Sequence, residues 1–370
     1  PAMLLANLLS EFAPGDLDYS FFVNSGSEAT ELAFRVALQY WREKGKPQKT
    51  RMISRWTSYH GSTMGALSMT GAVGRRSTYT PVLEHYPVVA PPYCYQCPLE
   101  KSYPGCNSFC ARELETAILR AGPDNVAGFI AEPFAGSSGA AFYPPPEYFS
   151  IVREICDKYD VLMIADEVMT GFGRTGRNFA IEHWGVVPDV IAFGKGVTSG
   201  YAPLAGCIIS SSIYKTIQEG SGVFALGHTF SGNPLSTAVG LRVVQYLYEH
   251  RLVDRSREMG EGLGDKLQRL AAQHPIIGNV RGKGLFWGVE FVRDRSTHEA
   301  FPFGANIAGQ VVDEAFGQGL MVYPARGAQD GAAGDAIIIA PPLTITETEL
   351  DELLSLLDST LARVEARAKW

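Results

Sequence analysis

The chain has 370 residues, of which 46% are hydrophobic and 19% are charged, so it holds enough apolar material for about two or three domains. Its formal net charge of -7 argues against a nucleic-acid-binding surface, and no apolar run reaches the roughly 18 residues that cross a bilayer. Six cysteines do not make a disulfide scaffold at this length. We expect a cytoplasmic globular protein of enzyme size. Because residue 1 is proline, we also expect the natural N-terminus to be missing.

Short apolar runs alternate with helix-like segments over the first two thirds of the chain. Each run is continuously apolar, which favours strands of a parallel sheet covered by helices on both faces. We predict strands at residues 21–23, 51–54, 128–131, 161–165, 190–193 and 206–209, and a helix over 29–41. Since ligands of open α/β sheets bind at the carboxyl ends of strands, we expect reactive side chains just after these runs.

The pattern changes after Pro234. A long amphipathic helix is predicted from Leu235 to Leu252, continuing after a break to Gln273. Glycine-punctuated strands follow, including residues 284–291, and a closing helix begins near Glu347. We therefore predict two domains: a large α/β domain over residues 1–250 and a smaller α+β domain over residues 251–370.

A turn of small residues follows the first run. Residues 24–29 read Asn-Ser-Gly-Ser-Glu-Ala and open the predicted helix. Free backbone N–H groups and the positive end of a helix dipole suit a phosphate there. The alternative is a serine N-cap with glycine in the turn. No Lys-Ser/Thr pair follows at the spacing of a Walker A loop.

Two later strands end in ionisable residues. Asp166 ends the run 161–165, where a buried carboxylate needs a cationic partner, unless it caps the next helix. Lys195 lies between two glycines after the run 190–193, either as a solvated loop residue or as a partly desolvated amine that attacks a carbonyl. Together with the turn, they supply what a pyridoxal phosphate site needs: an amine for the aldehyde, an anion for the ring nitrogen and donors for the phosphate.

With these residues in view, the chain resembles the class III pyridoxal-phosphate aminotransferases, the ω-aminotransferase group of fold type I, from about Leu17 to Leu354. The matching segments are Phe21-Phe22-Val23-Asn24-Ser25-Gly26-Ser27-Glu28-Ala29, Tyr59-His60-Gly61, Ala131-Glu132-Pro133, Ile164-Ala165-Asp166-Glu167-Val168, Gly171-Phe172-Gly173-Arg174-Thr175-Gly176, Gly194-Lys195-Gly196 and His228-Thr229-Phe230-Ser231-Gly232-Asn233-Pro234.

The resemblance implies a large domain with a mainly parallel sheet flanked by helices, plus a smaller C-terminal α+β domain. It also implies transfer of an amino group from an amine or ω-amino acid to a keto acid such as pyruvate, with pyridoxal 5'-phosphate as cofactor. The alternatives are an aminomutase, racemase or decarboxylase on the same fold, or a truncated inactive relative.

Roles are carried over from the same resemblance. Lys195 would form the Schiff base with the cofactor and move the proton during transfer. Asp166 would pair with the ring nitrogen, and Gly26 and Ser27 would hold the phosphate. Glu132 would orient groups near the cofactor hydroxyl.

Four further residues belong to this expected site. Tyr59 and Val168 would pack on the two ring faces, with ordinary core packing as the alternative. His60 is either a site residue or a hydrogen-bonded turn histidine. Thr229 would reach the phosphate of a neighbouring subunit, which implies a homodimer with shared active sites.

The sequence departs from the family pattern at two residue positions, and we also expect it to lack an N-terminal segment that helps to build the substrate pocket in relatives. Met169 stands where the family often has a glutamine that contacts the cofactor. Many relatives carry a substrate-binding arginine soon after the segment that matches 319–322. Here Arg326 is the nearest candidate for a carboxylate clamp, and a surface arginine is the alternative.

The cysteines raise the question of a metal. Four of them follow the spacing C-x2-C-x8-C-x3-C, which could bind zinc or an iron–sulfur cluster: Cys94, Cys97, Cys106 and Cys110. Because the loop is short for a zinc ribbon and the family chemistry needs no metal, we predict reduced thiols and no metal site. Cys156 and Cys207 are expected in the core.

Overall fold

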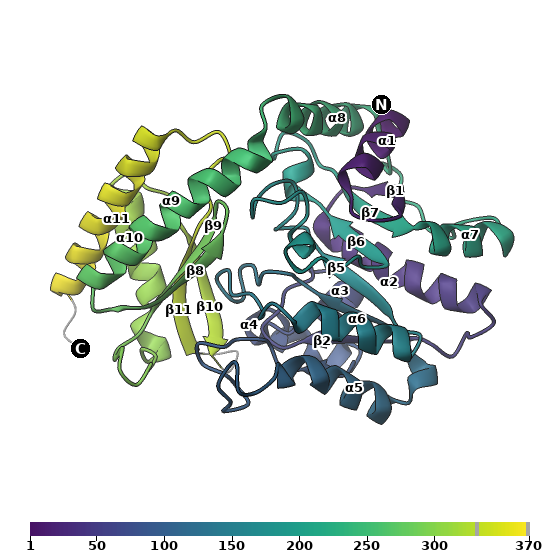
Figure 1. The fold of residues 1–370 in the computed structure, drawn as a ribbon, viewed down its shortest axis with the longest axis horizontal. Helices are drawn as coiled ribbons and strands as arrows, with labels where there is room; N and C mark the ends of the chain where they lie inside the picture. The colour runs from purple at the N-terminus through teal and green to yellow at the C-terminus, as the bar shows by residue number, and fades with distance from the viewer. Residues whose placement is uncertain (330–332, 368–370) are drawn as a thin grey trace.

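The computed structural model describes residues 1–329 and 333–367, which build two sheets with their covering helices (Figure 1). The larger sheet has seven strands in the order β1-β7-β6-β5-β4-β2-β3. Its strands are β1 (Leu17–Val23), β2 (Arg51–Arg55), β3 (Val88–Val89), β4 (Val126–Ala131), β5 (Leu162–Asp166), β6 (Val190–Phe193) and β7 (Ala205–Ser210). All six strands predicted from apolar runs are present, which confirms the α/β architecture.

The direction of one strand differs from the expectation. β7 runs antiparallel to both of its neighbours, β1 and β6, whereas the other strands all point the same way. The sheet is therefore mixed. An apolar run reports burial on both faces, and β7 is buried on both faces whichever way it runs.

Helices cover both faces of this sheet. One face packs on α1 (Ala2–Phe12), α5 (Phe109–Ala121), α6 (Tyr148–Lys158) and α8 (Pro234–Glu249). The other face packs on α2 (Gly26–Glu43), α3 (Met64–Met69) and α7 (Ser211–Glu219). Successive residues of β5 enter opposite layers, with Met163 in the first core and Ile164 in the second. This alternation is the pleat of a strand buried on both sides.

The smaller sheet is wholly antiparallel, in the order β10-β11-β9-β8. Its strands are β8 (Ile277–Lys283), β9 (Phe286–Phe291), β10 (Tyr323–Gln329) and β11 (Ala333–Ile339). A core of its own joins the sheet to α9 (Leu252–Gln273), α10 (Ile307–Gly317) and α11 (Glu347–Arg367). The remaining short helices are α4 (Val73–Arg76), η1 (Ser77–Val82), η2 (Pro123–Asn125), η3 (Ala180–Trp184), η4 (Lys195–Val197) and η5 (Phe303–Ala305).

The break between the two long helices lies earlier than predicted. α8 ends at Glu249, and Leu252, expected as the end of the first helix, instead opens α9. The backbone turns at Arg251, which has φ +49°. A glycine in the left-handed region often marks the end of a helix, but here that position is an arginine. The predicted break was therefore too late in the sequence. The closing helix begins at Glu347, as predicted.

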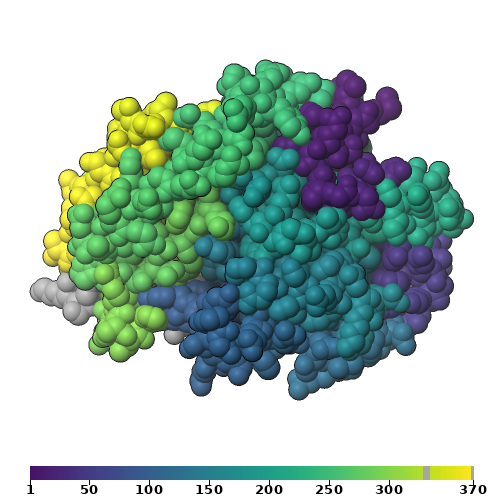
Figure 2. All heavy atoms as spheres, viewed as in Figure 1, coloured from purple at the N-terminus to yellow at the C-terminus, as the bar shows by residue number. Residues whose placement is uncertain are grey.

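The two parts meet through a buried hydrophobic cluster, which packs Phe134 and Ala140 against Phe286 and Ala325, and through a polar contact. Arg281 of β8 donates from Nε to the carbonyl oxygen of Ala140 at 3.1 Å and from Nη2 to that of Gly139 at 2.9 Å. The same guanidinium pairs with Glu290 of β9, which accepts a hydrogen bond from Tyr93 of the larger part. In Figure 2 the green and yellow C-terminal part lies directly against the teal centre. None of the described helices is both long and apolar enough to serve as a membrane span.

Candidate active site

The predicted site residues follow strands that end at one edge of the large sheet. β4, β5 and β6 are parallel neighbours, and Asp166 at the end of β5 pairs in register with Ala192 of β6. Glu132 therefore follows β4 at the same edge where Lys195 follows β6. β1 runs in the same direction and delivers Gly26 to that edge. The predicted site residues Glu132, Asp166 and Lys195 thus lie at the carboxyl ends of neighbouring strands, the edge where open α/β sheets bind ligands.

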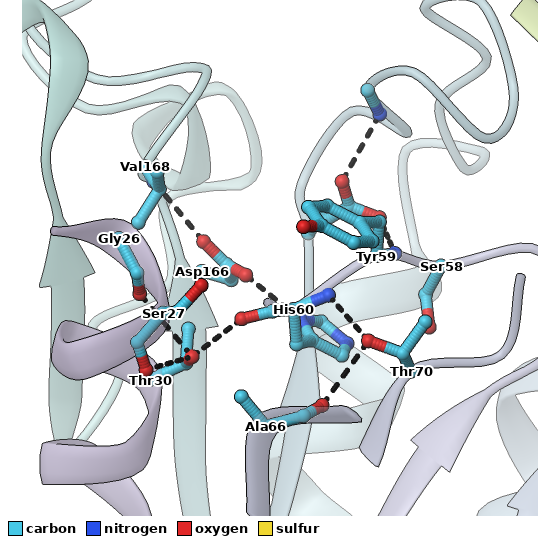
Figure 3. Close-up of polar contacts among 12 residues, drawn as sticks. Gly26, Ser27, Thr30, Ser58, Tyr59, His60, Ala66, Thr70, Asp166 and Val168 are labelled. Carbon is cyan, nitrogen blue, oxygen red and sulfur yellow. Dashed lines mark hydrogen bonds and ion pairs between the residues drawn. The ribbon is translucent and has the colours of Figure 1, made fainter. Parts of the chain in front are cut away.

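Asp166 contacts His60 in the interior of this edge. Nδ1 of His60 lies 2.7 Å from Oδ2 of Asp166, and the two residues are only 2% and 4% exposed. Oδ1 of Asp166 accepts a hydrogen bond from the backbone N–H of Val168 at 3.1 Å. Figure 3 shows His60 at the centre of these contacts. Nε2 of His60 is buried and has no hydrogen-bond partner among residues 1–329 and 333–367.

Two threonines that the sequence reasoning missed hold His60 in place. The backbone N–H of His60 donates to Oγ1 of Thr70 at 2.9 Å, and Oγ1 of Thr30 donates to the carbonyl oxygen of His60 (Figure 3). Thr30 lies on α2 and Thr70 follows α3. Neither residue belongs to a motif, and only the fold brings the three segments together.

The start of α2 has the geometry of an anion site. Oγ of Ser25 accepts from the backbone N–H of Glu28 at 3.3 Å, and the Glu28 carboxylate accepts from the N–H of Asn24 at 2.7 Å. These contacts confirm the serine N-cap and leave the N–H groups of Gly26 and Ser27 without a partner in the described chain. Both readings of the turn are therefore compatible: the capped helix still presents two free donors.

Gly26 is required by its neighbour. A Cβ added at Gly26 would lie 2.6 Å from Cγ1 of Val168, so only glycine lets the half-buried valine reach the start of α2. Oγ of Ser27 accepts from the backbone N–H of Ser62 at 3.0 Å, which connects the same turn to the segment that carries Tyr59. The structure thus brings Gly26, Ser27 and Val168 together.

Glu132 connects the segment of Tyr59 to β4. Oε2 accepts from the backbone N–H of Tyr59 at 3.2 Å, and Oε1 accepts from that of Gly136 at 3.1 Å. Burial raises the pKa of the Glu132 carboxyl, nearby Asp166 raises it further, and the positive charges around it oppose the shift. Met169 lies against the same turn, because a Cβ on Gly136 would lie 2.7 Å from its sulfur.

Lys195 has an unusual backbone. It opens η4 directly after β6 with φ +37°, a conformation that costs free energy for a residue with a Cβ. Its side chain is exposed at the sheet edge, close to the carboxyl end of β5. Gly196 fits tightly behind it, since a Cβ there would lie 2.9 Å from Cβ of Phe172. The fold therefore holds the lysine in a strained turn with its amine outward.

The two remaining predicted residues make no hydrogen bond or ion pair with this cluster in the described part of the chain. Arg326 of β10 is half-buried and pairs through Nε with Oδ1 of Asp335 at 3.2 Å. Burial raises the pKa of Asp335, opposed by the backbone N–H of Ile307 and by Arg326. Thr229 lies in the exposed loop between α7 and α8, and no hydrogen bond joins it to the other predicted residues in the described chain.

The cysteines form no metal centre in the part of the chain that the structure describes, where no group of three or more Cys, His, Asp or Glu side chains is arranged to hold an ion. Cys94 and Cys110 line one small cavity with Cys97 and Cys106. Burial raises the pKa of the Cys94 thiol to about 11 and that of Cys110 to about 12, so both stay protonated at neutral pH.

A model of the aminotransferase class-III family matches residues 1–361, which is nearly the whole chain. The chain belongs to the class III aminotransferases. An uncharacterized aminotransferase of Bacillus subtilis, YodT, is 48% identical over 369 residues, covering 100% of this chain and 83% of that relative. A putrescine–pyruvate aminotransferase of Pseudomonas aeruginosa is 37% identical over 374 residues, covering 99% and 79%.

The fold agrees with solved structures of transaminases. An amine transaminase from an uncultivated Pseudomonas species, in its PLP-bound form, matches with a TM-score of 0.90 at 33% identity, covering 98% of this chain and 81% of that one. This class III aminotransferase therefore has fold type I and catalyses PLP-dependent transamination. The family and the PLP-bound neighbour imply pyridoxal phosphate as the cofactor.

Proposed function

We propose that this aminotransferase moves an amino group from an amine or ω-amino acid to a keto acid such as pyruvate, with Lys195 as the attachment point of pyridoxal 5'-phosphate. The observation that carries the proposal is the buried contact of Asp166 with His60, 2.7 Å long, at the sheet edge that also carries Lys195. The putrescine–pyruvate aminotransferase among the relatives supports this pair of substrate classes.

The residues present fit the cofactor. The unpaired N–H groups of Gly26 and Ser27 at the start of α2 are suited to its phosphate. Asp166 would supply a buried carboxylate for the ring nitrogen. Next to it, the buried Nε2 of His60 has no hydrogen-bond partner in the described chain and could bond to a polar group of the cofactor. Val168 packs directly against Gly26, so its side chain lies beside the proposed phosphate donors.

Further residues are assigned in the same way. Tyr59 and Val168 would pack against the two faces of the ring, and Glu132 would orient groups near its hydroxyl. The hydrogen bond from the N–H of Tyr59 to Glu132 supports this pairing. Thr229, exposed in its loop, would reach the phosphate of a neighbouring subunit, so we propose a homodimer with shared sites.

When bound, pyridoxal phosphate supplies an electron-withdrawing ring that stabilises negative charge on the carbon that carries the amino group. Nζ of Lys195 would take the proton from the substrate carbon that carries the amino group and would deliver it to the aldehyde carbon of the cofactor. Both carboxylate oxygens of Asp166 are held in place, Oδ1 by the N–H of Val168 and Oδ2 by its contact with Nδ1 of His60. Arg326 would hold a substrate carboxylate through its Nη atoms, because Asp335 engages Nε.

The test is a half-reaction followed by product analysis. The protein loaded with pyridoxal phosphate is mixed with an amine donor, and the absorbance change of the cofactor is followed. We expect conversion of the spectrum, and turnover only when a stoichiometric keto acid is added. Product formation without any keto acid would instead indicate an aminomutase, racemase or decarboxylase. No spectral change across a broad panel of amines would contradict the proposal.

A further inference from the structure

A cavity of about 610 Å³ lies where the segment after α3 faces β10 and η5 of the smaller sheet. Its Arg75 contacts the ring of Tyr59, one of the proposed cofactor residues. The side chains that define it are Val73, Arg75, Ser138, Phe303, Tyr323 and Arg326. Sequence reasoning singled out only Arg326 among these.

The two arginines of the cavity differ in their charge balance. Arg326 has a carboxylate partner, Asp335. Arg75 is exposed, and among the described residues no carboxylate lies within ion-pair distance of it. Its contacts are the hydroxyl of Tyr323, 3.5 Å from Nη2, and the ring of Tyr59, 5.4 Å from Cζ. No Asp or Glu from the described ranges lines the cavity, which therefore keeps one uncompensated positive charge.

Apart from Ser137, Ser138 and Asn306, much of the remaining wall is apolar and exposed. Phe303 is 66% exposed and Val73 is 39% exposed, although both are large hydrophobic residues. Arg326 lies over the ring of Phe303, with Cζ 5.7 Å from the ring centre. A pocket with apolar walls and a few polar groups fixes the orientation of a ligand by those groups. The ligand that matches is a carboxylate on a short apolar chain.

We propose that Arg75 is a substrate-binding residue that, together with Arg326, holds the carboxylate of the keto-acid acceptor. This rests on the proposed function and assigns the acceptor end of its site. Arg75 supplies the net charge, because Asp335 already balances Arg326. Its contact with Tyr59, which is proposed to pack against the cofactor, places the bound carboxylate next to the reacting groups. Tyr323 carries a hydroxyl to the same place.

The experiment compares Arg75→Met with wild type in both halves of the reaction. For Arg75→Met we expect the KM for 2-oxoglutarate to rise about tenfold or more, since a hydrogen bond to a charged group is lost. Benzylamine has no carboxylate. The factor by which Arg75→Met lowers the rate of its half-reaction should therefore be about tenfold or more smaller than the factor by which it lowers kcat/KM for the keto acid. Arg75→Lys, which keeps the charge without the planar fork, should give an intermediate KM.

A binding measurement keeps the inference separate from the proposed function. Glutarate cannot accept an amino group, and it should raise the melting temperature of the wild-type holoenzyme more than that of Arg75→Met. Arg269→Met removes an exposed arginine from α9 and serves as the matched control, with KM within about twofold of wild type. An unchanged KM and an unchanged glutarate effect in Arg75→Met overturn the inference. Loss of the amine half-reaction in wild type overturns the proposed function instead, while the glutarate measurement still decides Arg75.

Discussion

Asp166 and His60 are 106 residues apart in the chain and form one buried contact. Each was recognised from a local motif, but whether His60 belongs to the site was open. The position of a residue after a strand predicts the edge of the sheet at which it lies. It does not predict which side chain from a distant loop will contact it there. The Thr30 and Thr70 hydroxyls that fix His60 carry no sequence signal, because threonines that bond the backbone occur throughout proteins.

Asp166→Asn tests the proposed anion for the ring nitrogen. We predict that the rate of the amine half-reaction falls about 100-fold or more, because a neutral amide cannot replace a buried charge aimed at the reacting group. Rapid-mixing absorbance with saturating amine gives the rate. Asp124→Asn, at an exposed position in η2, is the control. A fall of less than about threefold in Asp166→Asn would contradict the role, since removing a group that stabilises charge at the reacting centre costs far more.

Glu167 makes stability depend on pH. It is fully buried, and burial raises the pKa of its carboxyl to about 7. The folded protein therefore holds this proton more tightly than the unfolded chain, so stability is greatest below the unfolded pKa of 4.5 and is lost as pH rises to about 7. We predict that the free energy of unfolding falls between pH 4.5 and 8 by more in wild type than in Glu167→Gln, by up to about 3 kcal/mol.

Urea unfolding at several pH values measures that difference. Burial lowers the pKa of His183 to about 4, which acts in the opposite direction below pH 6.5, but this effect is common to both proteins and cancels. Parallel curves for wild type and Glu167→Gln would show that Glu167 does not cause the dependence.

At the scale of elements, the strands were predicted well and their directions less well. The apolar runs marked every strand of the large sheet that leads to a predicted site residue, whereas β10, which carries Arg326, was not predicted and the reversal of β7 has no composition signal. The helix break at Arg251 was missed for a related reason, since Leu252 is buried and continues the apolar pattern across the turn. Burial patterns report which residues face the core, and the path of the chain between elements is decided by packing.

The turn at the start of α2 gives an element-scale prediction. In Gly26→Ala the new Cβ would lie 2.6 Å from Val168, so either the valine or the first turn must shift. We predict that pyridoxal phosphate binds about tenfold or more weakly, because backbone donors act only at fixed positions. Cofactor titration by absorbance gives the Kd. Gly262→Ala on α9, where a Cβ meets nothing within 4 Å, should leave the Kd unchanged. Equal Kd values for Gly26→Ala and wild type would remove the turn from the site.

Lys49 connects three elements from the interior. It is 2% exposed, and its Nζ donates to the carbonyl oxygens of Pro123 at 2.9 Å, Val126 at 3.1 Å and Asp160 at 2.8 Å. Lys49→Met removes the charged donor from these buried carbonyl oxygens, so we predict a loss of about 3 kcal/mol in the free energy of unfolding. Lys215→Met, at an exposed position on α7, is the control and should change little. A loss below about 1 kcal/mol in Lys49→Met would show that water replaces the amine.

At the scale of the whole molecule, the division into residues 1–250 and 251–370 stays a proposal. It is supported by the hydrophobic cores: the cores of the large sheet draw their buried residues from positions up to 252, and that of the small sheet from 263 to 364. The sequence pattern predicted this change of architecture. It could not predict how the parts face each other, because Arg75 and Tyr323, which meet between them, are 248 residues apart. The acceptor pocket therefore became visible only in three dimensions.

Lys195 is proposed to carry the cofactor, and trapping the bond between them identifies the lysine. The holoenzyme is reduced with borohydride, digested, and mapped by mass spectrometry for the pyridoxyl label. The account predicts one labelled peptide, with the modification on Lys195, and no label in Lys195→Ala treated in the same way. A label on another lysine, or none on the wild-type holoenzyme, would contradict it.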